Sequence, residues 1–391
     1  MSASSATSRL DRQTLSAAVK AEAKRLGFEL AGIVPAVSPA GFADLKEWIG
    51  RGFSGEMEYM GRRIAAYEHP SHVLDQVRSI IVLAMNYRTA DPKPAGPMQG
   101  LISRYAWGRT DYHDLIRGKL QRLATFVHEQ RIGCRTRIVV DTAPLLERDF
   151  ARLAGLGWFG KNTMLINKQI GSWLFLAALL LDVELEYDRP HETAHCGTCT
   201  RCLDACPTDA FPEPYVLDAR KCISYLTIEL HQPISQELRE GMGQWLFGCD
   251  ICQDVCPWNR KAPVSDEAAF QPSDDLNSAE AVELLGMNDE QFHERFRHTA
   301  LSRPKRSGLL RNAAIVLGNS GDRRAVPSLI RALNDCEPLV RGAAAWALGR
   351  LGGADAMAAL QSRLNVEDNA DVEVELRVAV QAVFQRADSG R

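Results

Sequence analysis

Eight of the ten cysteines in this chain lie between Cys196 and Cys256, at spacings typical of iron–sulfur proteins. The first four follow the pattern C-x2-C-x2-C-x3-C and precede Pro207, as in bacterial ferredoxins. Three more precede Pro257, and the eighth lies between the two groups. Thiolates at this spacing in a tight loop can converge on one face of an iron cubane. The segment therefore predicts two 4Fe–4S clusters, which transfer electrons one at a time.

The spacing also predicts which cysteines share a cluster. In the ferredoxin pattern the fourth cysteine ligates the other cluster. Leu246 stands where the second run would have its first cysteine, and Cys222 is the candidate replacement. One cluster then takes Cys196, Cys199, Cys202 and Cys256, and the other takes Cys206, Cys222, Cys249 and Cys252.

Two other uses of these cysteines have to be weighed. Two structural zinc ions could also take eight thiolates, but zinc sites favour separated C-x2-C pairs over a continuous C-x2-C-x2-C run. Disulfides would require an oxidising compartment. Iron–sulfur ligation is therefore the preferred interpretation, and the rest of the chain should contain what receives the electrons.

Several polar residues in the first half could take part in chemistry, and each has a structural alternative. Asp141 follows a predicted strand, at the end where α/β sheets place their active sites, yet it or Thr142 could simply cap the next helix. His113, at a helix start, could be a ligand, a proton donor or structural. Lys161 and Asn162 could bind a ligand or face solvent. The residues alone leave these alternatives open.

The glycine-rich stretch before Lys161, G155-L-G-W-F-G160, matches G-x-G-x-x-G. A dinucleotide site needs a strand before this pattern and a helix after it. Here a predicted helix precedes and a predicted strand follows. A loop that lets the backbone approach some other cofactor is the better interpretation.

The elements that must position these residues alternate between helix and strand. Helical periodicity covers 15–26, 41–51, 112–131 and 145–154, and strand patterns cover 28–34, 79–87, 137–140, 171–181 and 183–187. Asp111 is placed to cap the longest helix. This alternation predicts an α/β domain over residues 1–188, followed by a ferredoxin-like domain over 189–262.

The C-terminal part has a different pattern. Residues 263–300 are polar and acid-rich, and we interpret them as a linker. From 301 to 391 a unit recurs: R311-N-A-A-I-V-L-G318 is followed by R341-G-A-A-A-W-A-L-G349. A helix-pair repeat with small residues at its seam predicts a short α-solenoid of HEAT-like repeats.

Composition excludes few functions. The chain has 391 residues and a net charge of -3, which gives no general attraction to nucleic acid. Residues 1–8 lack a signal-peptide core, and the apolar run at 173–181 is too short to span a bilayer. We expect a cytoplasmic protein without membrane contact. Arginines recur at equivalent turns of the repeats, where they could line a phosphate-binding edge.

Five motifs taken together resemble those of the epoxyqueuosine reductase family. They are R104-Y-A-W-G-R-T-D-Y-H113, V140-D-T-A-P-L-L-E-R148, G157-W-F-G-K-N-T163, C222-I-S-Y-L-T-I-E229 and C256-P-W-N259. The resemblance covers nearly the whole chain. It implies reduction of epoxyqueuosine to queuosine at the wobble position of tRNA, the last step of queuosine synthesis, with cobalamin and two 4Fe–4S clusters. It also implies a nitroreductase-like core in the α/β cobalamin-binding domain.

The resemblance implies roles for individual residues. Asp141 matches the family's proton donor. Segments that it implies to line the corrinoid pocket or face the substrate contain Arg62, Tyr105, His113, Lys161, Asn162, Thr163, Ser172, Ser224 and Tyr225. For contact with the tRNA backbone we expect Arg303, Lys305, Arg306, Arg311 and Arg341.

The implied reaction needs electrons and a proton. An external donor of the flavodoxin or ferredoxin type would reduce the clusters, which would reduce cobalamin, and Asp141 would protonate the departing oxygen. Such an acid needs a raised pKa, which burial beside an apolar corrin could supply. We expect a monomer. Two alternatives remain: a reductive dehalogenase-like corrinoid enzyme acting on a small molecule, and an electron carrier with a scaffold tail.

Overall fold

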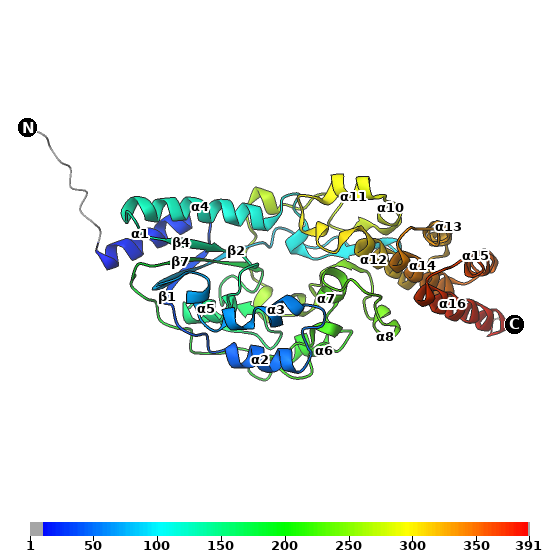
Figure 1. Cartoon of the computed structure of the whole chain (residues 1–391), viewed down its shortest axis with the longest axis horizontal. Helices are drawn as coiled ribbons and strands as arrows, with labels where there is room; N and C mark the ends of the chain where they lie inside the picture. The colour runs from blue at the N-terminus through cyan, green and yellow to red at the C-terminus, as the bar shows by residue number, and fades with distance from the viewer. Residues whose placement is uncertain (1–10, 390–391) are drawn as a thin grey trace, which may run out of the picture.

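The computed structural model describes residues 11–389, without the side chains of 387–389. The molecule is elongated, with the α/β part at one end and the helical repeats at the other (Figure 1). No helix within the described residues is both long and apolar enough to cross a bilayer.

A four-stranded sheet forms the centre of the α/β part. Its strands lie in the order β1, β2, β7, β4, and each neighbouring pair is antiparallel. They are β1 (Leu30–Pro35), β2 (Ser79–Asn86), β7 (Leu174–Leu181) and β4 (Thr136–Val139). Every residue of β2 is buried, because helices cover both faces of the sheet.

Alternate residues of β2 enter two separate cores. Ile81 and Leu83 pack with α1 (Arg12–Arg25) and α4 (Tyr112–Gln130), whereas Ile80 and Val82 pack with α5 (Glu147–Leu153). Figure 1 shows α1 and α4 on one side of the sheet and α5 on the other. As predicted, Asp111 caps α4, where its carboxylate accepts a hydrogen bond from the backbone N–H of His113 at 2.9 Å.

The strand predicted at 183–187 is wrong. Its backbone N–H groups donate to side-chain hydroxyls instead of a strand: Leu185 to Ser79, and Glu186 to Ser16. Three small elements complete this part. They are α2 (Phe42–Gly50), α3 (Glu58–Arg62) and the hairpin of β5 (Trp158–Phe159) with β6 (Leu165–Ile166).

The cysteine segment is held to the α/β part by a second sheet. Strand β8 (Trp245–Phe247) pairs in parallel with β3 (Gln99–Ile102), which pairs with β9 (Ala279–Glu280). Around β8 lie four short helices, α6 (Arg201–Asp204), α7 (Ile223–Ile228), α8 (Gln236–Arg239) and α9 (Ile251–Asp254).

The segment predicted as a linker is folded. Besides β9 it contains α10 (Ala281–Leu285) and α11 (Asp289–Phe296). Their apolar residues, among them Leu284 and Phe296, are buried in the core that also contains the repeats. Most of the sparse large apolar residues of this segment face the core, with Val264 exposed, which is why its sequence reads as polar.

The repeats form helices α12 (Lys305–Ser320), α13 (Val326–Ala332), α14 (Pro338–Leu351), α15 (Ala354–Leu364) and α16 (Ala370–Ser389). Small residues let the helices approach closely. A Cβ atom added to Gly318 would lie 2.9 Å from the Cα of Ala347 on α14. One core runs from the cysteine segment into the repeats, so the two parts are packed against each other.

Candidate functional site

A cleft of about 520 Å³ opens beside the start of β7 and the start of α5. Aromatic rings form much of its wall, including Tyr87, Tyr105, Tyr112 and Phe175. The rings of Tyr112 and Phe175 are stacked with their centroids 4.1 Å apart. An open cleft with flat, apolar walls fits a large planar ligand better than a small polar one.

Asp141 lies in this cleft, directly after β4. Its backbone has φ of 57°, in the left-handed region that aspartate tolerates better than most residues. The Tyr112 hydroxyl donates to its carboxylate at 3.2 Å, and Nε2 of His113 lies 3.3 Å from the same oxygen. Backbone strain at a polar residue in a cleft is typical of functional sites.

The charges around Asp141 determine where a proton is held. The hydrogen bond from His113 lowers the pKa of Asp141, and the guanidinium of Arg303, 3.7 Å away, lowers it further. Burial opposes the charge on His113, but its hydrogen bonds to Asp111 and Asp141 outweigh burial and raise its pKa to about 9. At neutral pH the histidine therefore carries the proton. A raised pKa of Asp141 beside a corrin stays a prediction.

Glu147 is a second carboxyl group in the cleft, at a position where the sequence pattern predicts only a helix. Its carboxylate accepts a hydrogen bond from the backbone N–H of Asp141 at 3.0 Å. Burial, together with the charge of Asp141, raises its pKa to about 8. Glu147 is thus protonated at neutral pH beside an ionised Asp141, so the two carboxyl groups have opposite protonation states.

Two predicted cofactor residues, Tyr105 and Ser172, line the cleft. Ser172 is fully buried, and its hydroxyl accepts a hydrogen bond from Asn259 at 2.9 Å. Arg62 is exposed at the end of α3, whereas Tyr59 and Met60 of the same helix line the cleft. The helix was predicted to reach the site through its arginine but reaches it through these two neighbours.

Five other predicted residues lie away from the cleft. Lys161 donates to the carbonyl of Gly197 at 2.8 Å, and buried Asn162 donates to the carbonyl of Cys252 at 3.3 Å. Both therefore support the cysteine loops. The remaining three are outside the cleft lining: Thr163 lines a separate pocket, and Ser224 and Tyr225 lie on α7, where the Tyr225 hydroxyl accepts from the backbone N–H of Glu56.

The eight cysteines of the central segment form no disulfide. Burial and the charges of Cys256, Cys196 and Cys199 raise the pKa of Cys202 to about 11. Burial likewise raises the pKa of Cys249, with Cys222 and Cys252 as its charged cysteine neighbours, and that of Cys222, with Cys206 as its neighbour. Cys252 has Cys222 of its own predicted set and Cys202 of the other set as charged neighbours, so the division of the cysteines into two sets stays a prediction from their spacing.

Two observations bear on what these sets could hold. Among residues 11–389, no three His, Cys, Asp or Glu side chains lie close enough to hold a single metal ion. The indole N–H of Trp158, which packs with Cys256 and Cys196, is buried without a hydrogen-bond acceptor. A cluster sulfur would satisfy it.

One residue links the cysteines to the cleft. Gln253 follows Cys252, is buried, and donates to the Ser172 carbonyl at 2.9 Å. Its side chain also lies 3.3 Å from the hydroxyl of Tyr87. The second set of cysteines therefore lies directly behind one wall of the cleft, as electron transfer into the cleft would require.

The arginines predicted to bind tRNA have different positions. Arg303 lies at the cleft, paired with Glu229 at 2.8 Å and close to Asp141. Lys305 is exposed. Three others are buried and cannot form a phosphate-binding edge: Arg306 pairs with Asp335, Arg341 pairs with Glu367, and Arg311 donates to the carbonyls of Leu226, Leu230 and Gln232.

Three protein families match parts of this chain. Residues 68–142 match epoxyqueuosine reductase QueG, DUF1730. Residues 195–259 match the 4Fe-4S double cluster binding domain, and residues 298–380 match the HEAT repeats. The ferredoxin-like and HEAT-like parts of the predicted fold are confirmed by these matches.

Curated relatives extend the likeness over most of the chain. The epoxyqueuosine reductase of Pseudomonas aeruginosa is 41% identical over 347 residues, which are 88% of this chain and 96% of the relative. The epoxyqueuosine reductase of Escherichia coli is 37% identical over 345 residues, 87% of this chain and 90% of the relative.

Solved structures show the same fold. An epoxyqueuosine reductase bound to an epoxyqueuosine-modified stem loop of tyrosine tRNA superposes with a TM-score of 0.88 at 31% identity, covering 95% of this chain and 99% of that one. An epoxyqueuosine reductase from Bacillus subtilis, with its aspartate-containing catalytic loop swung out of the active site, gives 0.87 at 29% identity, covering 94% and 99%. A reductive dehalogenase gives a TM-score of only 0.41 at 16% identity.

Proposed function

This chain belongs to the epoxyqueuosine reductase family, and from that premise we propose that it reduces epoxyqueuosine to queuosine at the wobble position of tRNA. The observation that carries the proposal is the position of the Asp141 cleft: Ser172 in its wall accepts a hydrogen bond from Gln253, which directly follows Cys252. Reduction of an epoxide-bearing ring needs both protons and electrons, and the chain supplies a separate site for each.

We assign two 4Fe–4S clusters to the central segment and cobalamin to the cleft. Cobalamin, when bound, would supply low-valent cobalt as the reductant of the ring, fed with single electrons by the clusters. The residues present fit both groups: eight free cysteines in two sets, and a cleft walled by Tyr105, Tyr112 and Phe175. These walls would hold a corrin by apolar contact and exclude water from the reacting atoms.

The protein's own part in the reaction is to hold and deliver a proton. In the free cleft Asp141 and His113 share one proton, which resides on the histidine. Filling the cleft with an apolar ring and a substrate base would desolvate Asp141 and raise its pKa, which draws this proton toward the departing oxygen. Tyr112 and Arg303 would hold the carboxylate in position, and protonated Glu147 would keep a second negative charge out of the cleft.

The tRNA would approach over the start of the repeats. Arg303 lies close to Asp141, and exposed Lys305 is the first residue of α12; both could neutralise anticodon-loop phosphates. The target base must leave its stack to reach the cleft, as in other enzymes that modify bases.

Each part of the chain has its own role in this proposal. Residues 1–188 bind the cofactor and supply the proton, and residues 189–262 transfer electrons. The parts from 263 onward support the fold and contact the tRNA. We also propose a monomer and an external donor of the flavodoxin or ferredoxin type.

A conversion assay tests this function. Anaerobically reconstituted protein is mixed with an epoxyqueuosine-bearing tRNA stem loop and a chemical reductant, with and without added cobalamin, and the nucleosides are measured by mass spectrometry. We expect queuosine only when cobalamin is present. Equal conversion without a corrinoid, or no conversion with clusters and corrin both bound, would contradict the proposal.

A further inference from the structure

The glycine-rich stretch of residues 155–160 contributes to the hairpin of β5 and β6. Its glycines allow close packing of the backbone. A Cβ atom added to Gly157 would collide with the carbonyl oxygen of Ile166 on the facing strand, so a larger residue does not fit there. The large side chain that this tight hairpin positions is Trp158, the first residue of β5.

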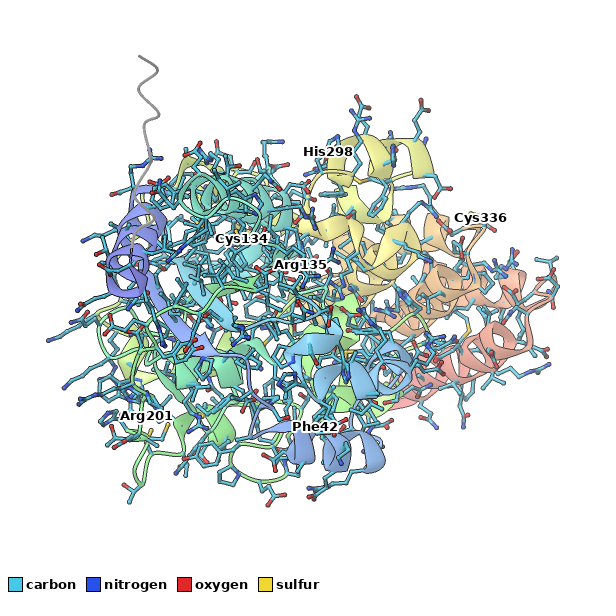
Figure 2. The ribbon with its side chains drawn as sticks, turned by 60° about the vertical axis from the view of Figure 1, so that its left-hand side comes forward. Phe42, Cys134, Arg135, Arg201, His298 and Cys336 are labelled. Atoms are coloured by element: carbon cyan, nitrogen blue, oxygen red, sulfur yellow. The ribbon has the colours of Figure 1, made fainter. Side chains whose placement is uncertain are left out.

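The turn of this hairpin holds the cysteine loops through their backbone. Lys161 donates to the carbonyl of Gly197 at 2.8 Å, and Asn162 donates to the carbonyl of Cys252 at 3.3 Å. The other side of the first loop faces solvent, because Arg201 in this loop is exposed, and Figure 2 shows it at the edge of the molecule. The hairpin therefore contacts the cysteine loops from the protein side.

Trp158 is buried against two cysteines, Cys196 and Cys256, that the spacing predicts to share a cluster. The residue is only 2% exposed. The Nε1–H group of its indole is buried and has no hydrogen-bond acceptor within the described chain. A buried donor without an acceptor is costly and rare in folded proteins. We therefore expect this N–H to have a partner that the polypeptide itself does not supply.

Aromatic rings enclose the indole on other sides. The His191 ring stacks on it with centroids 5.5 Å apart, and the rings of Trp258 and His195 meet it edge-on at 5.0 Å and 4.7 Å. None of these rings accepts the indole hydrogen within the described residues, and Nε2 of His191 is itself buried without a partner. Sulfur at the two cysteines is therefore the acceptor that these surroundings offer.

We infer that the Nε1–H of Trp158 donates a hydrogen bond to a sulfur of the cluster that Cys196 and Cys256 hold, and that this bond raises the reduction potential of that cluster. The inference rests on the proposed function, because it needs the assigned 4Fe–4S cluster. A cluster gains one negative charge when it is reduced, and a donor dipole at its sulfur stabilises that charge. Hydrogen bonds to sulfur and exclusion of solvent are among the factors that set cluster potentials.

The bond would make the two clusters unequal. Trp158 packs with cysteines of the first predicted set, so its effect should fall on one cluster and leave the other unchanged. A difference in potential between two clusters determines which of them holds a single electron. Trp158 would thus act through the cluster and without contact to the reacting atoms of the substrate.

A redox titration of Trp158→Phe tests the bond. Phenylalanine keeps a ring against the cysteines but has no N–H group. The matched control is Trp258→Phe, which removes an indole from the same group of rings at a partly exposed position. The full-length proteins are reconstituted without oxygen and titrated with dithionite and redox mediators. Electron paramagnetic resonance follows the reduced clusters, and iron content is measured for each protein.

We expect one of the two clusters in Trp158→Phe to have an equilibrium constant for reduction about tenfold smaller, which lowers the midpoint of a one-electron couple by about 59 mV. The other cluster, and both clusters of Trp258→Phe, should keep the wild-type midpoints. Unchanged midpoints in Trp158→Phe, equal shifts of both clusters, or the same shift in Trp258→Phe would overturn the inference.

Isotope labelling detects the bond directly, and it decides the question if Trp158→Phe loses iron. Protein with nitrogen-15 only in its indole rings is reduced, and the coupling of this nitrogen to the cluster spin is measured by pulsed electron paramagnetic resonance. We expect a coupling that persists in Trp258→Phe, and its absence from either protein would overturn the inference. A wild-type chain without iron would overturn the proposed function as well, whereas full iron without the coupling would overturn this inference alone.

Discussion

The cleft and the cysteine segment are built from residues at very different separations along the chain. The cysteines of the first set come from two short loops and those of the second from three short stretches between Cys206 and Cys252, and their spacing is itself the signature of their chemistry. Asp141 instead meets His113, Glu147 and Arg303, which come from three different elements. The first region handles electrons and the second handles protons. The comparison teaches that a motif can specify a ligand set, whereas an acid–base site exists only after folding.

Loss of a cluster ligand should have the largest effect on turnover. It should impair electron transfer and leave tRNA binding intact. We expect Cys252→Ser to lower turnover by more than about 100-fold, because loss of groups that merely support a metal ligand already costs 10- to 100-fold. Stem-loop affinity should be retained. Iron analysis, electron paramagnetic resonance and the conversion assay check this, with Cys336→Ser, an exposed cysteine outside the segment, as the control.

Removal of the Asp141 carboxyl group should leave the iron–sulfur clusters and corrin binding intact. Asp141→Asn keeps the shape of the side chain but cannot pass a proton, so we expect turnover to fall by about 100- to 10,000-fold. Cluster content and corrin binding should be unchanged, as seen by absorbance. Asp114→Asn, at an exposed position on α4, is the control. Normal turnover in the Asp141 variant would remove the residue from the mechanism.

The pH dependence of kcat/KM distinguishes His113 from Glu147 as the protonated group that the reaction needs. His113 has a pKa raised to about 9, so its proton is present below that pH and is lost as pH rises through it. We expect kcat/KM to fall about tenfold for each pH unit above 9. His113→Gln should remove this limb. If kcat/KM instead falls as the pH rises through about 8, and this fall disappears in Glu147→Gln, the required proton belongs to the Glu147 carboxyl group.

The buried arginines should affect stability and not tRNA binding. Arg311 donates to three backbone carbonyls of the segment after Cys222. Arg311→Met removes the donor from the buried carbonyl of Leu226 and from the part-buried carbonyls of Leu230 and Gln232, and a buried acceptor without a donor costs about 1–3 kcal/mol. We expect a lower urea midpoint and weaker retention of iron, whereas Arg324→Met, at an exposed position, should leave the midpoint nearly unchanged. Stem-loop affinity that fell without any loss of stability would contradict the structural role.

A surface charge should give the smallest effect. Lys305 is exposed beside Arg303 and is placed to meet phosphate. Lys305→Glu should weaken stem-loop binding several-fold at low salt, and the difference should shrink as salt rises. Fluorescence anisotropy measures this, with Lys24→Glu on α1 as the control. Equal affinities for both variants at every salt concentration would exclude the tRNA from this surface.

The sequence predicted what depends on neighbours along the chain. The cysteine pattern, the buried strand β2 and the Asp111 cap each depend on residues close together, so periodicity and spacing suffice. The buried state of Arg306, Arg311 and Arg341 depends on carboxylates and carbonyls that other elements bring to them. A recurring arginine has the same sequence pattern whether it faces solvent or the core.

The same limit explains the errors in the cofactor site. Lys161 and Asn162 lie in a motif that suggested the cleft, yet their partners are carbonyls of the cysteine loops. Glu147 was visible only as part of a helix, and its raised pKa comes from burial and from Asp141. Neither the partner nor the burial is encoded in nearby residues.

The most direct test of the whole account is the metal content of protein purified and reconstituted without oxygen. We predict about eight iron atoms per chain, four for each cluster of the double-cluster domain, together with about one cobalt atom after incubation with cobalamin. Zinc in place of iron, or a cobalt content that stays near zero while iron is complete, would contradict the claim that this chain delivers electrons from two clusters into a corrin-binding cleft.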